Sequence, residues 1–258
     1  MKKLMLLVVL LTALSACKKD VKTTDTDTTS PPLTPTNTLS IKFENYAGTT
    51  PLILNTVDYV NQHSDTFKVS LFNYYISNIQ LTATDSFVYS ETYSYHLIKA
   101  SDFNSLEFSL PNVPLKNFKA ISFMIGVDSL HNVSGAQSGA LEPLNGMFWD
   151  WNSGYIMSKF EGTSPQSPLL GHTLLYHQGG FSGPDNVIKT VNLNFPNNAT
   201  VTTAISPKVI LKADLLEWFK TPNIVNFSTL TTIHMPGTDA KLIADNYADM
   251  FSVTQVQN

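Results

Sequence analysis

The sequence predicts a mainly β protein: an antiparallel β-sandwich with long loops and one or two short C-terminal helices. Three observations predict this fold. Apolar and polar residues alternate in several short segments, clusters of glycine, proline and asparagine separate these segments, and helix-like spacing is confined to the last third of the chain. Short strands with one buried face, punctuated by turns, are typical of a sandwich.

The N-terminal segment predicts a lipoprotein signal peptide at residues 1–16. Two lysines precede an apolar stretch over residues 4–14, which is too short to span a bilayer, and the sequence LSAC follows. Cys17, the single cysteine, is the expected lipidation site, so no thiol would remain for a disulfide or a metal. We therefore expect a protein of the bacterial cell envelope that is held by its lipid on the outer membrane, on either the periplasmic or the surface face.

Residues 17–37 are predicted to be a lipid-anchored, disordered linker, because they consist mainly of threonine, aspartate, lysine and proline. Residues 38–258 have the length of one all-β domain. The chain contains 16 Lys+Arg and 20 Asp+Glu residues, and none of the basic residues is arginine. An acidic chain without guanidinium groups is poorly suited to phosphate contacts, so we expect no nucleic-acid partner.

Period-two alternation predicts the strands of the domain. It is found at residues 41–43, 67–71, 121–127 and 187–195. Turn-forming residues predict connectors at 47–51, 110–114, 164–168 and 179–184. These segments together predict the two-sheet architecture.

Two short helices are predicted to close over the sheets. Residues 212–220 carry Leu215, Leu216, Trp218 and Phe219 at helical spacing and end before Pro222. A second helix would be capped by Thr238 or Asp239 and would bury Ile243, Tyr247 and Met250.

Residues 146–162, which read GMFWDWNSGYIMSKFEG, are the most unusual stretch of the chain. Two of the three tryptophans lie there between two glycines, and polar groups stand beside the indoles. One reading is an aromatic platform of Trp149, Trp151 and Tyr155 that stacks a sugar or another planar ligand. The other readings are the frame of a metal site, or a strand whose two indoles point to opposite faces for structural reasons.

Standard catalytic motifs for hydrolysis and nucleotide binding are absent from the sequence, and we expect no enzymatic activity. The six histidines show no spacing typical of a metal motif, so a metal site would have to be assembled from distant strands and loops. Taken one at a time, each histidine is better explained as an exposed or hydrogen-bonded residue than as a metal ligand. Without a free thiolate, a copper site would need nitrogen, oxygen or thioether ligands.

Several ordered blocks of the sequence are similar to the MbnP-like family. The blocks are FNYYISNI (72–79), ISFMIGVD (121–128) with Asn132 after it, GALEPLNGMFWDWNSGY (139–155), YHQGG (176–180) and ADNYADMF (244–251). They extend across nearly the whole predicted domain. The family takes its name from a copper-binding protein that is encoded with methanobactin operons.

The resemblance implies an extracytoplasmic β-rich protein that holds copper for storage, delivery or sensing. It also implies that a tryptophan, Trp149 or Trp151, is oxidised to kynurenine by a partner di-haem oxidase of the MauG type. Imidazoles complete the copper site in such proteins. His177 is the first candidate ligand here, followed by His96 and His234.

Overall fold

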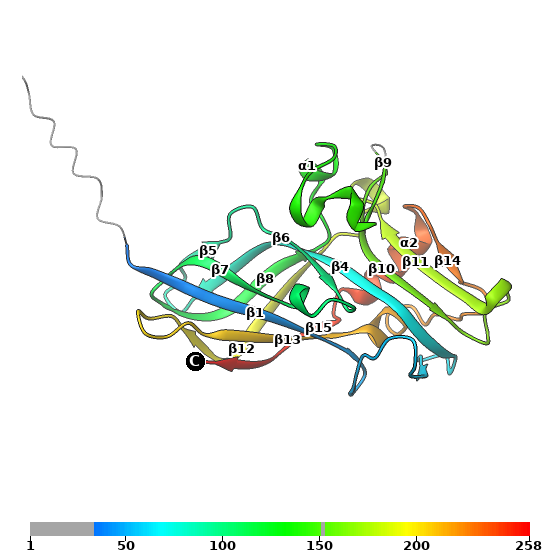
Figure 1. The fold of residues 1–258 in the computed structure, drawn as a ribbon, viewed down its shortest axis with the longest axis horizontal. Helices are drawn as coiled ribbons and strands as arrows, with labels where there is room; N and C mark the ends of the chain where they lie inside the picture. Colours follow the sequence, from blue (N-terminus) through cyan, green and yellow to red (C-terminus); the bar gives the residue numbers. More distant parts are fainter. Residues whose placement is uncertain (1–33, 151–152) are drawn as a thin grey trace, which may run out of the picture. The chain divides into compact units, whose positions relative to one another are not determined.

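The computed structural model describes residues 34–150 and 153–258, which fold mainly into β-strands as predicted (Figure 1). The strands are β1 (Thr36–Ala47), β2 (Thr50–Pro51), β3 (Tyr59–Val60), β4 (Thr66–Ala83), β5 (Val88–Ser90), β6 (Tyr95–Lys99), β7 (Glu107–Pro114), β8 (Asn117–Ile125), β9 (Phe148–Asp150), β10 (Gly154–Thr163), β11 (Thr173–Gly179), β12 (Lys189–Thr200), β13 (Lys208–Asp214), β14 (Thr232–Ile233) and β15 (Phe251–Gln257). The α-helices are α1 (Ser129–Asn132) and α2 (Thr238–Tyr247). Short 3-10 helices are η1 (Phe103–Ser105), η2 (Gly139–Leu141), η3 (Pro143–Asn145), η4 (Leu170–His172), η5 (Gly183–Asp185) and η6 (Leu215–Phe219).

The described strands form two sheets. In the first sheet the order is β15-β13-β1, and β2 and β7 also pair with β1. In the second the order is β12-β8-β4-β10-β11-β14, with β3, β5 and β6 also paired to β4 and β9 paired to β10. Asn73 of β4 is opposite both Lys99 of β6 and Lys159 of β10, so β6 and β10 lie on opposite edges of β4.

Aromatic side chains from both sheets form the core between them. The ring of Phe43 in β1 lies 6.1 Å from the ring of Tyr74 in β4 and 6.2 Å from that of Phe123 in β8, centre to centre. Phe251 of β15 approaches Phe123 to 5.1 Å. All four rings are buried and meet edge to face, a favourable arrangement for aromatic pairs. Two sheets that share such a core confirm the predicted sandwich.

The sandwich departs from the purely antiparallel prediction at two places. Strand β1 runs parallel to β13, and β14 runs parallel to β11. Both parallel pairs join segments that are far apart in the sequence, which is the usual requirement for parallel pairing. In the second pair, β14 ends at Ile233, so His234 follows it directly.

The connector predicted at residues 110–114 is wrong, since these residues belong to β7. Among the described strands β7 pairs only with β1, so its outer edge needs no backbone donors. Pro111 and Pro114 are therefore tolerated, as prolines are at sheet edges. The outer edge is instead used by Tyr89, whose hydroxyl donates to the Pro111 carbonyl at 2.7 Å.

The helix predicted at residues 212–220 is also wrong in part. Strand β13 continues to Asp214, and the following η6 is a 3-10 helix whose first turn is capped by the Asp214 carboxylate. Its Trp218 and Phe219 are buried, as the apolar pattern suggested. Helices are not confined to the last third of the chain, because α1 lies in its middle.

Helix α2 confirms the second predicted helix, with Gly237 in the N-cap position instead of Thr238 or Asp239. Ile243 and Tyr247 are buried as predicted. Thr34–Asn258 forms one compact unit, and β1 begins two residues before the predicted start of the domain at 38. Nowhere in the described part of the chain is a helix both long and apolar enough to cross a membrane.

Candidate metal centre

The parallel pairing of β14 with β11 brings two predicted ligands together. Leu175 is opposite Thr232 and Tyr176 is opposite Ile233, so the next residue of each segment is a histidine, His177 or His234. Their imidazole rings lie 5.4 Å apart, centre to centre, with an interplanar angle of 84°. His177 is mostly buried and His234 is exposed, so the pair lies where the edge of the second sheet meets solvent.

The spacing of the two rings suits one shared metal ion. An imidazole nitrogen binds a transition metal at about 2 Å, which puts the centre of the ring roughly 3 Å from the ion. Two imidazoles that are bound at tetrahedral or wider angles therefore have centres roughly 5–6 Å apart. The separation of His177 and His234 falls in this range.

A carboxylate orients His177. The Nε2 atom of His177 lies 2.9 Å from Oε1 of Glu161, which is on the neighbouring strand β10. Hydrogen bonding of one imidazole nitrogen to a carboxylate is the usual arrangement of a metal-binding histidine, because it fixes the ring and leaves the other nitrogen for the metal. The nitrogen available for an ion is thus Nδ1.

Burial lowers the pKa of His177, and the positive charge of Lys159 lowers it further against the opposing effect of Glu161. Lys159 is directly opposite His177 in the β10–β11 ladder, and its ammonium lies 3.3 Å from Glu161. A lowered pKa keeps the imidazole neutral at neutral pH, which is the form that binds metals.

Trp149 packs on Gly179 of the strand that carries His177. Its indole lies so close to Gly179 that a Cβ atom at this glycine would be 2.1 Å from Cζ3 of the ring. Gly179 is two residues after His177 on β11, so both residues belong to the same face, about 7 Å apart along the strand. Only glycine fits at position 179, because the Trp149 indole occupies the space that a Cβ atom would need.

The structure places the third predicted ligand, His96, elsewhere. Strands β4 and β10 separate β6 from β11, a distance of roughly 14 Å at the usual strand spacing. Its Nε2 atom lies 2.9 Å from Glu91, and its ring stacks on Phe108 at 3.5 Å. The other histidines each have partners of their own: His63 with Asp65, His131 with Asp128 and Tyr95, and His172 with the Ser167 carbonyl.

Two predicted functional residues, Cys17 and Trp151, lie outside the described residues. Tyr155 is fully buried and donates its hydroxyl to the Leu141 carbonyl at 2.7 Å, so it is not available to stack a ligand. The three-ring aromatic platform therefore loses one of its members. Met147 is also fully buried, whereas Met235, next to His234, is exposed.

The donors at the pair fit copper better than a harder ion. Across residues 34–150 and 153–258, no three side chains of histidine, cysteine, aspartate or glutamate are grouped closely enough to hold a metal. Two imidazoles would have to be completed by another kind of donor, such as the thioether of Met235, the sequence neighbour of His234. Imidazole and thioether ligands are typical of copper.

Comparison with known proteins decides the family. The family model described as MbnP matches residues 36–235, more than half of the chain, and this range includes Trp149, His177 and His234. The chain belongs to the MbnP family. The solved structure of MbnP from Methylosinus trichosporium is similar, with a TM-score of 0.56 and 12% sequence identity over 86% of this chain and 99% of that chain. At this identity the match shows a shared MbnP fold, and a comparison with curated proteins finds no match.

Sequence reasoning missed Lys159, Gly179 and Asn132 as parts of this MbnP-family site and its surroundings. Strand periodicity puts His177 with Gly179 on one face of β11 and Lys159 with Glu161 on one face of β10. That pattern was visible in the sequence, but the register that brings the two faces together was not.

Proposed function

We propose that this protein binds copper in the bacterial cell envelope and stores, delivers or senses the metal while its lipidated Cys17 holds it on the outer membrane. The observation that carries the proposal is the placement of His177 and His234 with their rings 5.4 Å apart. Membership of the MbnP family supports the choice of copper among the metals that imidazoles bind.

Each residue of the centre has a defined part in this proposal. His177 and His234 supply the imidazole nitrogens, Glu161 fixes the ring of His177, and Lys159 helps to keep that ring neutral. Bound copper would supply a one-electron redox centre.

We further propose Trp149 as the tryptophan that a partner di-haem oxidase of the MauG type converts to kynurenine. Its contact with Gly179 holds it on the strand that carries His177. Oxidative cleavage of the indole C2–C3 bond, with peroxide as the oxidant and release of C2 as formate, leaves an aryl amine. That nitrogen would be a further ligand beside the two imidazoles.

Copper titration of the purified protein and of single variants tests the metal proposal. His177→Ala and His234→Ala should each weaken copper binding by more than the roughly 10–100-fold effect of losing an outer-shell partner. His96→Ala is the matched control, since this histidine also contacts a glutamate but lies on the other side of β4. Absence of uptake by the wild-type protein, or an equal loss in His96→Ala, would contradict the proposal.

Peptide mass spectrometry of the protein from its native cells tests the proposed modification. Conversion to kynurenine adds one oxygen and removes one carbon, and fragment ions locate the change at Trp149 or Trp151. A modification at Trp151 alone would contradict the assignment to Trp149 and leave the histidine pair untouched.

A further inference from the structure

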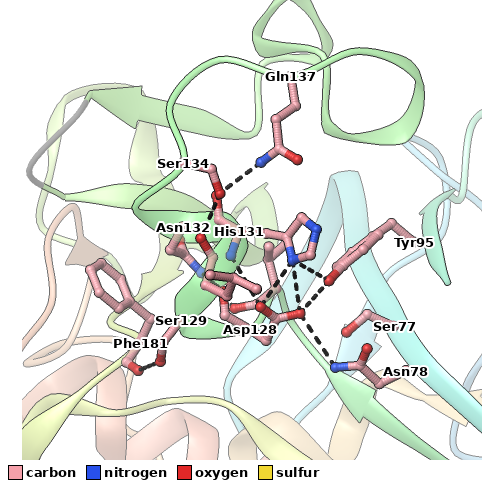
Figure 2. Close-up of polar contacts among 12 residues, drawn as sticks. Ser77, Asn78, Tyr95, Asp128, Ser129, His131, Asn132, Ser134, Gln137 and Phe181 are labelled. Atoms are coloured by element: carbon pink, nitrogen blue, oxygen red, sulfur yellow. Dashed lines mark hydrogen bonds and ion pairs between the residues drawn. The ribbon is translucent and has the colours of Figure 1, made fainter. Parts of the chain in front are cut away.

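Helix α1 is a four-residue helix that lies against the tryptophan-bearing segment. A single turn has almost no stability of its own, so its position must be fixed by contacts to other elements. Figure 2 shows these contacts, which reach Tyr95 of β6 and Asn78 of β4 on one side and Phe181 on the other. The helix therefore connects parts of the fold that are distant in sequence.

Asp128 anchors the start of α1. Its carboxylate accepts a hydrogen bond from the His131 backbone N–H at 3.1 Å and contacts the His131 ring at 3.0 Å. The Tyr95 hydroxyl donates to the same carboxylate, and the Asn78 amide approaches it at 3.4 Å. These bonds fix the helix to the second sheet.

The side chain of Asn132 connects α1 to strand β10. It is 1% exposed, and its Nδ2 donates to the Val127 and Asp128 carbonyls at 2.5 and 2.9 Å. Its Oδ1 accepts a hydrogen bond from the Tyr155 backbone N–H at 2.8 Å. The same oxygen would lie 2.4 Å from a Cβ atom at Gly154, whose φ is +71°. Only glycine fits at position 154, because any Cβ atom there would overlap the Asn132 side chain.

The same helix also contacts the segment that follows β11. The Ser129 hydroxyl donates to the Phe181 carbonyl at 2.7 Å, and the Phe181 ring lies 3.3 Å from the position of a Cβ at Gly154. Residue 181 is two positions after Gly179, on which Trp149 packs. Helix α1 thus contacts both the start of β10 and the segment that follows β11, the strand that carries His177 and Gly179.

Strand pairing transmits the position of Tyr155 to Trp149. In the β9–β10 ladder Phe148 is opposite Tyr155 and Asp150 is opposite Gly154, so Trp149 is the extra residue of a β-bulge and is held by a paired neighbour on each side. The rings of Phe148 and Tyr155 are 4.9 Å apart. A shift of the first residues of β10 would therefore move the indole relative to Gly179 and His177.

We propose that Asn132 is a positioning residue for the candidate metal centre, which acts by fixing the start of β10 and, through the β9–β10 ladder, the Trp149 indole. The part of this inference that concerns copper rests on the proposed function. The part that concerns the indole does not.

The test compares two buried asparagines in the full-length protein labelled with 7-fluorotryptophan, because Gly179 packs against the Cε3–Cζ3–Cη2 side of the Trp149 ring. Asn61→Ala is the matched control, because Asn61 also donates to a backbone carbonyl (Val225) and accepts from a backbone N–H (Asp65) but lies next to β3. The fluorine resonance of residue 149 is assigned from its loss in Trp149→Phe. Copper affinity is measured on the same variants by titration with copper alone.

Asn132→Ala should shift or broaden the Trp149 resonance, leave the Trp218 resonance in place and weaken copper binding about tenfold or more. Asn61→Ala should lower the unfolding midpoint without either effect. Should Asn132→Ala fail to fold, Tyr95→Phe, which removes one hydroxyl contact to Asp128, should shift the same resonance to a smaller extent.

An unchanged Trp149 resonance in both Asn132→Ala and Tyr95→Phe, or an equal change in Asn61→Ala, would overturn the inference. Should the wild-type protein take up no copper, the proposed function fails, and the fluorine spectra alone decide the role of Asn132.

Discussion

Glu161 and Glu91 make the same contact with a histidine in two different places. Each presents a carboxylate oxygen 2.9 Å from a histidine Nε2, but Glu161 holds His177 beside a second imidazole, whereas Glu91 holds His96 against Phe108. Burial opposes ionisation of Glu161, but the His177 contact and the charge of Lys159 outweigh it and lower its pKa. The carboxylate is thus ionised at neutral pH and able to orient its imidazole.

Glu161→Gln should weaken copper binding by roughly 10–100-fold, because the amide can no longer accept the hydrogen bond with a full negative charge. The fold should persist, since the replacement has the same shape and the site is partly exposed. Metal titration of Glu161→Gln beside Glu91→Gln checks this expectation. Equal affinity in the two variants would show that the carboxylate of Glu161 does not act on a metal-binding imidazole.

The junction between β13 and η6 depends on one side chain, that of Asp214. Its Oδ1 accepts from the Leu216 N–H at 3.1 Å and from the Gly48 N–H at 2.8 Å, and its Oδ2 lies 3.0 Å from the Lys212 ammonium. One carboxylate therefore ends a strand, starts a helical turn and holds the turn after β1. This explains why the helix predicted at 212–220 begins only after residue 214.

Asp214→Ala should lower the free energy of unfolding by about 0.5–2 kcal/mol through the lost cap alone, with a further loss for the unpaired Gly48 N–H. Urea denaturation measures the change. Asp239→Ala is a suitable control, because Asp239 lies in the first turn of α2, whose N-cap has no side-chain hydrogen bond. Copper affinity should be unchanged in Asp214→Ala, since the hydrogen bonds of Asp214 go to Gly48, Lys212 and Leu216 and not to either histidine.

Local patterns predicted the strands well because alternation of exposed and buried residues is itself a local property. Residues 41–43 and 67–71 are in strands, and Phe43 and Phe67 are fully buried. The same reasoning could not find the ladder between β11 and β14, because each of these strands could pair with any free edge. That ladder brings His177 and His234 together. Sequence reasoning could therefore select both histidines as candidate ligands but could not predict that they are neighbours in the fold.

His96 shows the opposite case. Its chemistry, burial and neighbouring glutamate are those of a good ligand, and nothing local separates it from His177. The distinction comes from β4, which pairs with β6 on one edge and with β10 on the other. Only the complete order of the sheet shows that the two histidines cannot share an ion.

At the scale of the whole molecule, the candidate metal centre belongs to one sheet and the first described strand to the other. His177 and His234 lie on β11 and directly after β14 in the second sheet, whereas β1 is a central strand of the first. The core between the sheets is complete within residues 34–258, through contacts such as those of Phe43 with Tyr74 and Phe123. We therefore expect that neither folding nor the proposed metal binding requires the predicted lipid at Cys17.

Cys17→Ser should accordingly separate localisation from binding. The variant, with residues 1–16 removed by the signal peptidase of the host or by design, should appear in the soluble fraction after cell lysis, because the acyl chains proposed for the wild-type protein would contribute about 0.8 kcal/mol for each buried methylene and would be lost together. Its thermal midpoint and copper affinity should equal those of the wild-type protein. His177→Ala is the complementary control, which should remain in the membrane fraction and lose copper. Retention of Cys17→Ser in the membrane once residues 1–16 have been removed would refute the lipid anchor, and a loss of copper by this variant would show that the anchor and the metal centre are not independent.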